Sequence, residues 1–275
     1  MHERNNGYRD VTSSDILILA GKRPLPGTVL ADVRAHLERG GLRVCVDWRD
    51  PLDALATARP ALLVHRGLTP EMLGRLAAAE CPRDVAVVNP PAACLLALDR
   101  GRALDSLRGA GVPVPRSSVE TDWADVRRLI HRGAVYVKAL SGSIGRGAGV
   151  VSLPRSTITA DPPFPGPWHV ETAASSDGLD RKLYVVGSRV FGLLKPWPRE
   201  GVPARPFEPP VAMTELALAV GRAVGLELFG VDLVGRDDEF AVVDLNPFPG
   251  YRGVEGAAAA VAEHVAARIA AARSH

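Results

Sequence analysis

The sequence has 275 residues and a formal net charge of +2 at pH 7, with 47% hydrophobic and 23% charged residues. This balance is typical of a soluble globular protein of one to three small domains, and the dispersed basic residues give no reason to expect a nucleic-acid partner. Cys45, Cys81 and Cys94 lack paired spacing, which favours reduced thiols over a disulfide framework or a zinc site.

The chain begins with a polar stretch, residues 1–14, which we expect to be a flexible tail. This stretch lacks the apolar segment that a signal peptide requires. No apolar run approaches the roughly 18 residues that a membrane-spanning helix needs. These features predict a cytoplasmic protein without a membrane partner.

The next segment alternates short apolar runs with helical patterns. We predict helices at 27–41 and 70–79 and strands at 15–20, 44–46, 61–64 and 85–88. Such alternation is typical of an open α/β domain, which we assign to residues 15–95. His65 and Arg66 end a strand at the edge where such sheets place ligands, and a buried histidine that caps the strand is the alternative. No glycine fingerprint of a dinucleotide site follows the first strand.

The central segment, assigned to residues 96–165, contains a glycine-rich turn. We predict helices at 92–110 and 122–132 and strands at 134–138 and 149–152. The first helix is ended by Gly111-Val-Pro-Val-Pro115. The two strands flank the glycine-rich turn and form a hairpin with it, whereas a Walker phosphate loop would connect a strand to a helix.

The last segment, assigned to residues 166–275, is rich in strands. We predict strands at 168–171, 181–186, 189–195, 229–234 and 240–246, and helices at 211–224 and 256–272. The stretch 196–210 holds six prolines in fifteen residues, so we predict an irregular excursion that passes over a site. The last two strands are joined by the turn 235–239 and are expected to pair.

Acidic and amide side chains on this strand pair predict a metal site. Asp244 and Asn246 are two residues apart on one strand and face the same side, and the preceding strand can bring Asp232 alongside. Three oxygen ligands suit Mg²⁺, which prefers a few carboxylates completed by phosphate oxygens and water. The alternative is that Asp244 and Asn246 only end a strand before Pro247.

Lys138 ends an apolar strand beside a loop of small residues that runs from Ser141 to Gly149. Glycines allow backbone N–H groups to approach phosphate oxygens closely, and the lysine adds a positive charge. We therefore expect a phosphate-binding flap here. A flexible hairpin with a snorkelling lysine is the alternative.

These motifs, in this order, resemble the ATP-grasp superfamily. Lys138 and the run Ser141-Gly-Ser-Ile-Gly-Arg-Gly147 are followed by Glu171 and Asp180. The three predicted metal ligands, here called the metal trio, come last: Asp232, Asp244 and Asn246. The chain is similar in particular to the RimK-like branch, whose founding member adds glutamate to the carboxyl end of a ribosomal protein. The closing motif of that branch resembles Asn246-Pro-Phe-Pro-Gly-Tyr-Arg-Gly-Val-Glu255. The resemblance implies an α/β fold in which an N-terminal open α/β domain precedes two α+β subdomains that clasp ATP.

The resemblance implies a role for each matching position. Lys138 would hold the α- and β-phosphates, and the glycine-rich loop would close over the γ-phosphate. Glu171 and Thr172 would form the adenine-binding hinge. The nucleotide-binding residues would be Arg100, Lys138, Ser141, Gly142, Ser143, Gly145, Gly147, Glu171, Thr172, Asp180 and Lys182. The metal ligands, for one or two Mg²⁺ ions that Mn²⁺ can replace, would be Asp232, Asp244 and Asn246.

Two positions depart from the family pattern. Arg100 stands where the family's linker usually carries a lysine, and its planar guanidinium keeps the charge but not the shape of an ammonium group. Asp244 stands where the usual metal ligand is a glutamate. The inositol polyphosphate kinase branch shares this variant, and its motif is similar to Asp244-Leu-Asn-Pro-Phe-Pro-Gly-Tyr251.

A ligase of this type needs cations for its carboxylate substrate and for the charge that develops on the tetrahedral intermediate. The basic candidates are Lys182, Lys195, Arg199, Arg205 and Arg252, of which we predict Lys195, Arg205 and Arg252 to be catalytic. A solvated loop is the alternative for Arg199 and Arg205, and a surface ion pair is the alternative for Arg252.

The predicted function is that of an ATP-dependent carboxylate–amine ligase, which works through an acyl phosphate and releases ADP and phosphate. Its partners would be a small-molecule or peptide carboxylate and an amine acceptor, and the resemblance is compatible with a homodimer. One alternative is a small-molecule kinase of the inositol phosphate kinase type, which phosphorylates a hydroxyl. A second alternative is a non-catalytic ATP-binding module, against which the retained acids of the metal trio argue.

Overall fold

The computed structural model describes residues 14–79, 85–140, 149–156, 161–196, 202–237 and 239–274. The chain divides into two compact units, one with residues 1–91 and 256–275 and one with residues 92–255. The expected tail, apart from Ser14, lies outside the described residues. Within the described ranges, no helix is both long and apolar enough to cross a membrane.

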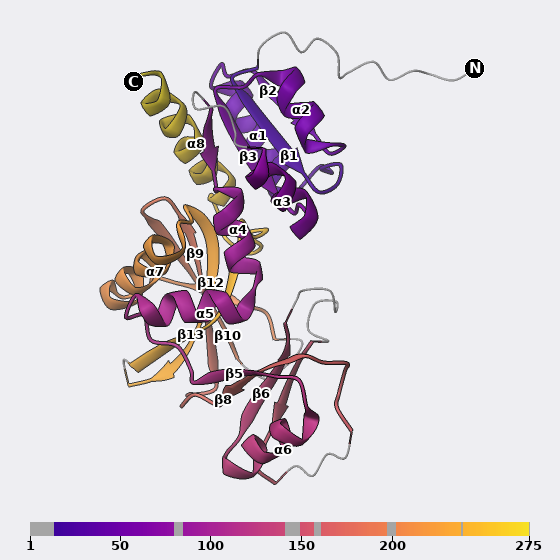
Figure 1. Cartoon of the computed structure of the whole chain (residues 1–275). Helices are drawn as coiled ribbons and strands as arrows, with labels where there is room; N and C mark the ends of the chain where they lie inside the picture. Colours follow the sequence, from indigo (N-terminus) through magenta and orange to yellow (C-terminus); the bar gives the residue numbers. More distant parts are fainter. Residues whose placement is uncertain are drawn as a thin grey trace, which may run out of the picture. The chain divides into compact units, whose positions relative to one another are not determined.

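The first unit is built on an open parallel sheet (Figure 1). Its strands are β1 (Ile16–Ala20), β2 (Val44–Asp47), β3 (Leu62–Arg66) and β4 (Ala86–Val88), and their order in the sheet is β2-β1-β3-β4. All side chains of β1 are buried, as expected for a strand that is covered on both faces. The predicted α/β alternation is confirmed in this unit.

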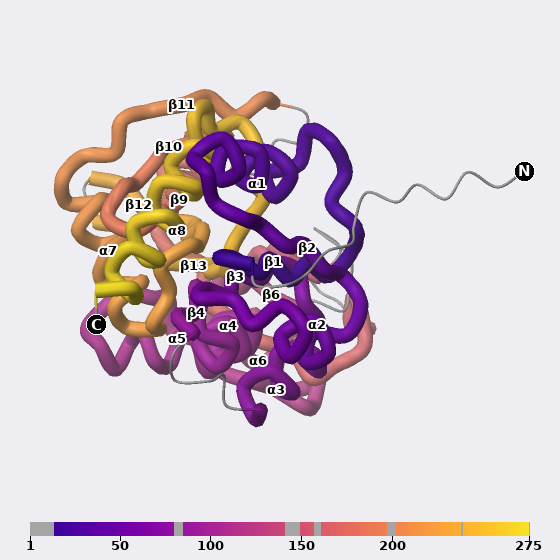
Figure 2. Tube along the Cα trace, turned by 90° about the horizontal axis from the view of Figure 1, so that it is seen from above, coloured from indigo at the N-terminus to yellow at the C-terminus, as the bar shows by residue number. Residues whose placement is uncertain are grey.

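Four helices accompany this sheet: α1 (Val29–Arg39), α2 (Pro51–Ala58), α3 (Pro70–Ala78) and α8 (Ala257–Arg273). Helix α2 was not predicted, although Asp50 caps it by accepting hydrogen bonds from the backbone N–H groups of Leu52 and Asp53. Helix α8, which the sequence pattern grouped with residues 166–255, instead packs against α1 and β4 in the first unit (Figure 2). An ion pair of 2.5 Å between Arg273 and Asp15 joins its end to the start of β1.

The second unit contains two antiparallel sheets, of which the first is called the β6 sheet. Its strands are β5 (Ser117–Glu120), β6 (Val135–Ala139), β7 (Val150–Leu153) and β8 (Trp168–Thr172), in the order β5-β8-β6-β7. The β6–β7 hairpin is confirmed, whereas β5 was not predicted. Strand β8, which we predicted to begin the last segment, pairs with β5 and β6 and therefore belongs to the β6 sheet. The apolar face packs on helix α6 (Trp123–Arg132), and because side chains alternate along a strand, the opposite face is polar.

The second sheet of this unit is called the β9 sheet. Its strands are β9 (Leu179–Val186), β10 (Arg189–Pro196), β11 (Arg205–Phe207), β12 (Leu228–Arg236) and β13 (Glu239–Pro247), in the order β11-β10-β9-β12-β13. The predicted β12–β13 hairpin is confirmed. The irregular excursion predicted over 196–210 is wrong in one part, because residues 205–207 pair with β10 as an edge strand, a position that tolerates Pro206. Residues 197–201 lie outside the described part.

Three helices complete the second unit: α4 (Pro91–Leu98), α5 (Arg100–Gly109) and α7 (Val211–Val224). The single helix predicted over 92–110 is interrupted at Asp99, whose side chain caps α5 by accepting a hydrogen bond from the backbone N–H of Arg102. Helix α5 contacts α7 and β13. The interruption therefore puts Arg100 in the first turn of a helix that lies against the strand with the predicted metal ligands.

Candidate functional site

A β-bulge aligns the acidic residues of the β12–β13 hairpin. From the turn inward, the pairing is regular as far as Leu233 and Val242. The register then shifts, so that Asp232 lies opposite Asp244 and Val243 is the additional residue in β13. The bulge therefore brings two carboxylates side by side on one face of the β9 sheet.

Basic and acidic side chains of β9 and β10 share this face. Lys182 is the cross-strand neighbour of Asp232, and its Nζ atom lies 2.7 Å from Oδ1 and 2.5 Å from Oδ2 of that carboxylate. Asp180, two residues earlier on β9, lies opposite Lys195 of β10. The structure thus brings three predicted nucleotide or catalytic residues next to the predicted metal ligands.

The carboxylates on this face are crowded and partly removed from water. Burial is the main cause that raises the pKa of Asp232 to about 7, and the carboxylates of Asp180 and Asp244 add to the rise while the Lys182 ammonium opposes it. Burial likewise raises the pKa of Asp180 against the attraction of two lysines. Burial acts to lower the pKa of Lys182, but the adjacent Asp232 carboxylate outweighs it, so that this pKa is raised.

Such crowding suits a divalent cation, because each carboxylate would then be attracted to the cation, which would offset the repulsion between the carboxylates. The Asp244 side chain is 41% exposed and the Asp232 side chain 19% exposed, and Asn246 follows Asp244 on the same face. Among the described residues, no cluster of three or more His, Cys, Asp or Glu side chains is arranged to hold a metal ion. Two carboxylates and one amide oxygen, completed by phosphate oxygens and water, would fit the coordination that Mg²⁺ prefers.

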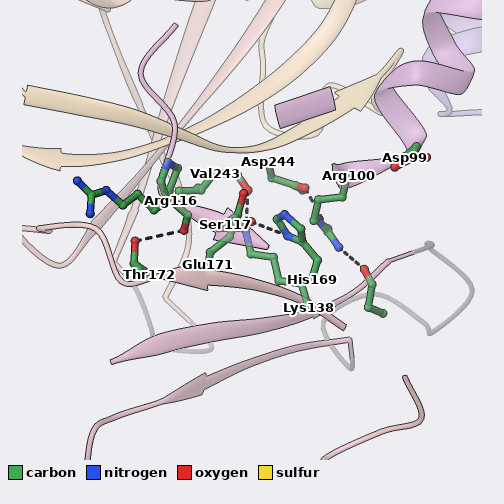
Figure 3. Close-up of polar contacts among 12 residues, drawn as sticks. Asp99, Arg100, Arg116, Ser117, Lys138, His169, Glu171, Thr172, Val243 and Asp244 are labelled. Carbon is green, nitrogen blue, oxygen red and sulfur yellow. Dashed lines mark hydrogen bonds and ion pairs between the residues drawn. The ribbon is translucent and has the colours of Figure 1, made fainter. Parts of the chain in front are cut away.

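Arg100 connects this acid pair to the β6 sheet (Figure 3). Its Nη2 atom donates to Oδ1 of Asp244 at 3.0 Å, and its Nη1 atom donates to the carbonyl oxygen of Ala139 at 2.7 Å. Ala139 is the last residue of β6 and directly follows Lys138. The arginine fork therefore bridges two chain segments that the sequence separates by more than a hundred residues.

Lys138 lies at the centre of a buried polar network on the β6 sheet (Figure 3). The residue is 6% exposed, and its Nζ atom lies 2.7 Å from Oε2 of Glu171 and 2.7 Å from the carbonyl oxygen of Val243. The second carboxylate oxygen of Glu171 lies 3.2 Å from Nδ1 of His169. Burial acts to raise the pKa of Glu171, but His169 and Lys138 outweigh it, so that this pKa is lowered and the carboxylate is ionised at neutral pH.

The other predicted site residues are more peripheral. Thr172 is exposed and donates a hydrogen bond of 3.3 Å to the carbonyl oxygen of Arg116 (Figure 3). Arg205 and Arg252 are also exposed, so that their predicted catalytic roles stay predictions. The residues of the predicted site that lie outside the described ranges are Ser141, Gly142, Ser143, Gly145, Gly147 and Arg199.

Two histidines show what sequence reasoning found and missed. His169 was missed, although its place two residues before Glu171 on a strand indicates that both side chains face the same way. For His65, the structure favours the alternative of a buried histidine over a ligand-binding one. Its Nε2 atom lies 2.7 Å from the carbonyl oxygen of Asn89, and burial lowers its pKa to about 4.

Comparison with known proteins gives one family match and several relatives. The family model for the inositol 1,3,4-trisphosphate 5/6-kinase ATP-grasp domain matches residues 200–267. A probable alpha-L-glutamate ligase of Legionella pneumophila (strain Corby) is 28% identical over 176 residues. This match covers 58% of the present chain and 58% of the ligase, so that the chain spans less than two thirds of that relative.

Solved structures match over nearly the whole chain. The ATP-grasp ligase PsnB, complexed with minimal precursor, Mg and ADP, has a TM-score of 0.71 and 22% identity, and the match covers 93% of this chain and 98% of PsnB. The macrocyclase MdnC from Microcystis aeruginosa MRC, bound with precursor peptide MdnA, has a TM-score of 0.71 and 14% identity, with 92% and 99% covered. Part of the chain therefore matches an ATP-grasp domain model, and the chain is similar to probable glutamate ligases and, in its fold, to ATP-grasp ligases.

Proposed function

We propose that the protein is an ATP-dependent carboxylate–amine ligase that forms an amide bond through an acyl phosphate. The observation that carries this proposal is the bridge made by Arg100 between the end of β6 and the Asp244 carboxylate. Through this bridge, the strand with the phosphate-binding Lys138 adjoins the acid pair expected to hold Mg²⁺. The relatives named as glutamate ligases support the same type of reaction.

In this proposal, Lys138 and Arg100 bind phosphate oxygens of ATP as charged hydrogen-bond donors. Asp232, Asp244 and Asn246 would hold one or two Mg²⁺ ions, for which Mn²⁺ could substitute. When bound, such ions would neutralise negative charge on the phosphates of ATP. These residues keep the phosphates in line for transfer, because phosphoryl transfer depends mainly on positioning and on electrostatic stabilisation.

The chemistry proceeds in two steps. A carboxylate oxygen of the first substrate attacks the γ-phosphorus of ATP, the bond from that phosphorus to the bridging oxygen breaks, and ADP leaves. The amine then attacks the acyl carbon, phosphate leaves with the electron pair of the broken C–O bond, and the amine loses a proton. We assign Lys195, Arg205 and Arg252 to the binding of the carboxylate and to the charge that develops on the tetrahedral intermediate.

We propose a peptide or an amino acid as the carboxylate substrate and an amino group as the acceptor. Support comes from the solved relatives, since PsnB is complexed with a minimal precursor and MdnC with a precursor peptide. Glutamate is the first amine to test, because the curated relatives are named for it. Since the reaction consumes ATP, we propose that it takes place in the cytoplasm.

A kinase is the second candidate, because the inositol 1,3,4-trisphosphate 5/6-kinase model matches residues 200–267, which include β12 and β13. In a kinase, the same residues would bind the nucleotide, and an alcohol oxygen would attack the γ-phosphorus in place of the carboxylate. The product would then carry a stable phosphate ester, and an amine would have no effect on ADP release.

Oxygen transfer distinguishes these candidates. The full chain is incubated with ATP, Mg²⁺ and carboxylates that carry a heavy isotope of oxygen, with and without an amine. An acyl phosphate moves one labelled oxygen into the released phosphate, so labelled phosphate that requires both substrates supports the ligase. Phosphorylation of a polyol would support the kinase. ATP binding without ADP release across amino acids, dipeptides and polyols would contradict both and favour the non-catalytic module.

A further inference from the structure

His169 lies on the polar face of the β6 sheet. Cross-strand pairing puts it opposite Lys138 of β6, and Glu171 follows two residues later on the same face. The neighbouring Trp168 and Val170 belong to the apolar cluster on the other face. The imidazole is therefore on the side of the phosphate-binding lysine and not in the hydrophobic core.

His169 and Glu171 are polar partners of each other. Each residue is 1% exposed, and Nδ1 of the histidine lies 3.2 Å from Oε1 of the glutamate. Neither of these two buried atoms makes a hydrogen bond of good geometry to any described residue, so the two polar groups face each other at this distance without a formed hydrogen bond. An ionised carboxylate can only accept, so the imidazole can donate to this oxygen only in a form that carries a proton on Nδ1. Without the imidazole, this buried carboxylate oxygen would lose the polar group that it faces, which is costly.

Glu171 in turn restricts the orientation of the Lys138 ammonium group. Its Oε2 atom accepts from the lysine Nζ, which also donates to the carbonyl oxygen of Val243. An ammonium group has three N–H bonds, and two fixed acceptors determine the direction of the third. Because Val243 is the bulge residue beside Asp244, this direction is set relative to the strand that carries the metal ligands.

We propose that His169 is a positioning residue of the nucleotide site, which holds Glu171 in place and through it directs Lys138 toward the phosphates of the nucleotide. This inference rests on the proposed binding of ATP to this unit, and it gives a role to a side chain outside the motifs that carry the resemblance. The competing explanation is that the three buried groups only stabilise the β6 sheet. A purely structural role would lower the melting temperature without a selective effect on phosphate binding.

The first test compares ADP and adenosine, because adenosine has no phosphate for Lys138 to bind. In His169→Leu, we expect the affinity of the full chain for ADP to fall at least about tenfold, as measured by calorimetry. The affinity for adenosine, measured by competition, should not change. His169→Asn places an amide nitrogen near the position of Nδ1 and should retain ADP affinity within about threefold of the unmodified protein. Val170→Ala is the matched control, since it alters the opposite face of the same strand.

The second test asks whether His169 acts through Lys138. In a Lys138→Met background, His169→Leu should have no further effect on ADP affinity, because coupled residues are not additive. Equal losses in both backgrounds, equal losses for ADP and adenosine, or tighter ADP binding would each overturn the inference. If His169→Leu does not fold, weak ADP binding by His169→Gln together with normal binding by His169→Asn supports it, and equal binding by both contradicts it. Failure of the unmodified protein to bind ADP would instead contradict the proposed function.

Discussion

Asp232 and Asp244 lie directly opposite each other on neighbouring strands because Val243 is an additional residue in β13. If the regular register between Leu233 and Val242 continued, Val243 would lie opposite Asp232, and Asp244 would lie on the other face of the sheet. The two-residue period of a strand makes this one-residue shift decisive. The bulge is therefore the local feature that assembles the acid pair.

We expect Asp244→Asn to abolish Mg²⁺-dependent turnover while the fold survives. The substitution keeps the shape of the side chain but removes a hard anionic ligand, and activity should fall at least about a hundredfold. The measurement is ADP release over a Mg²⁺ titration, with thermal melting as a check of folding. Asp237→Asn, in the exposed turn of the same hairpin, is the control. Turnover of Asp244→Asn at the level of this control would refute the metal assignment.

Arg100→Met should change the affinities for metal and nucleotide in opposite directions. Without the guanidinium, Asp244 loses its cationic partner, so the affinity for Mg²⁺ in the absence of nucleotide should rise several-fold, whereas the affinity for ATP should fall. Calorimetric titrations with each ligand check this result. Arg102→Met, an exposed position on the same helix, should change neither affinity. A parallel loss of both affinities would show that Arg100 has only a structural role.

Lys138→Met should weaken the binding of ATP and ADP by about 2 kcal/mol, the size expected for a lost charge-assisted contact. The substitution also leaves the Glu171 carboxylate buried without a cation, so Lys138→Met combined with Glu171→Gln keeps the buried network neutral. Both variants are compared with Lys22→Met, which lies in the first unit. Nucleotide affinity equal to that of the Lys22 variant would count against the assignment.

The stability of the first unit should depend on the titration of His65. Burial lowers the pKa of this histidine from 6.5 to about 4, so between these values the unfolded chain binds a proton more readily than the folded chain. The free energy of unfolding should therefore fall as the pH drops from about 6.5 to about 4, by up to roughly 3 kcal/mol.

Urea unfolding at a series of pH values measures this dependence. His65→Gln keeps a donor for the carbonyl oxygen of Asn89 but cannot titrate, so its unfolding free energy should fall less steeply over the same range. His36→Gln, on helix α1, should retain the full pH dependence. An identical slope for His65→Gln and the unmodified chain would show that another group controls acid unfolding.

Much of the secondary structure was predictable because its signals are local. Helix α7 begins at Val211 and ends at Val224, as its apolar spacing predicts, and Gly225 follows in the left-handed conformation that ends many helices. The short elements α2, β5 and β11 were missed because they contain few periodic positions. For the candidate site, the spacing of Asp244 and Asn246 on one strand predicted which residue types gather near the C-terminus.

The sequence by itself determined the order of the longer elements, the alternation of polar and apolar faces, and the presence of a hairpin with acidic residues after the strand that carries Lys138. Only the tertiary structure decided that a bulge at Val243 aligns Asp232 with Asp244, that Arg100 bridges to this pair, and that α8 packs in the first unit. The physical reason is the distance along the chain over which each kind of interaction acts. Periodicity and caps act within a few residues, whereas strand register and ion pairs between distant segments depend on packing that forms only when the whole unit folds.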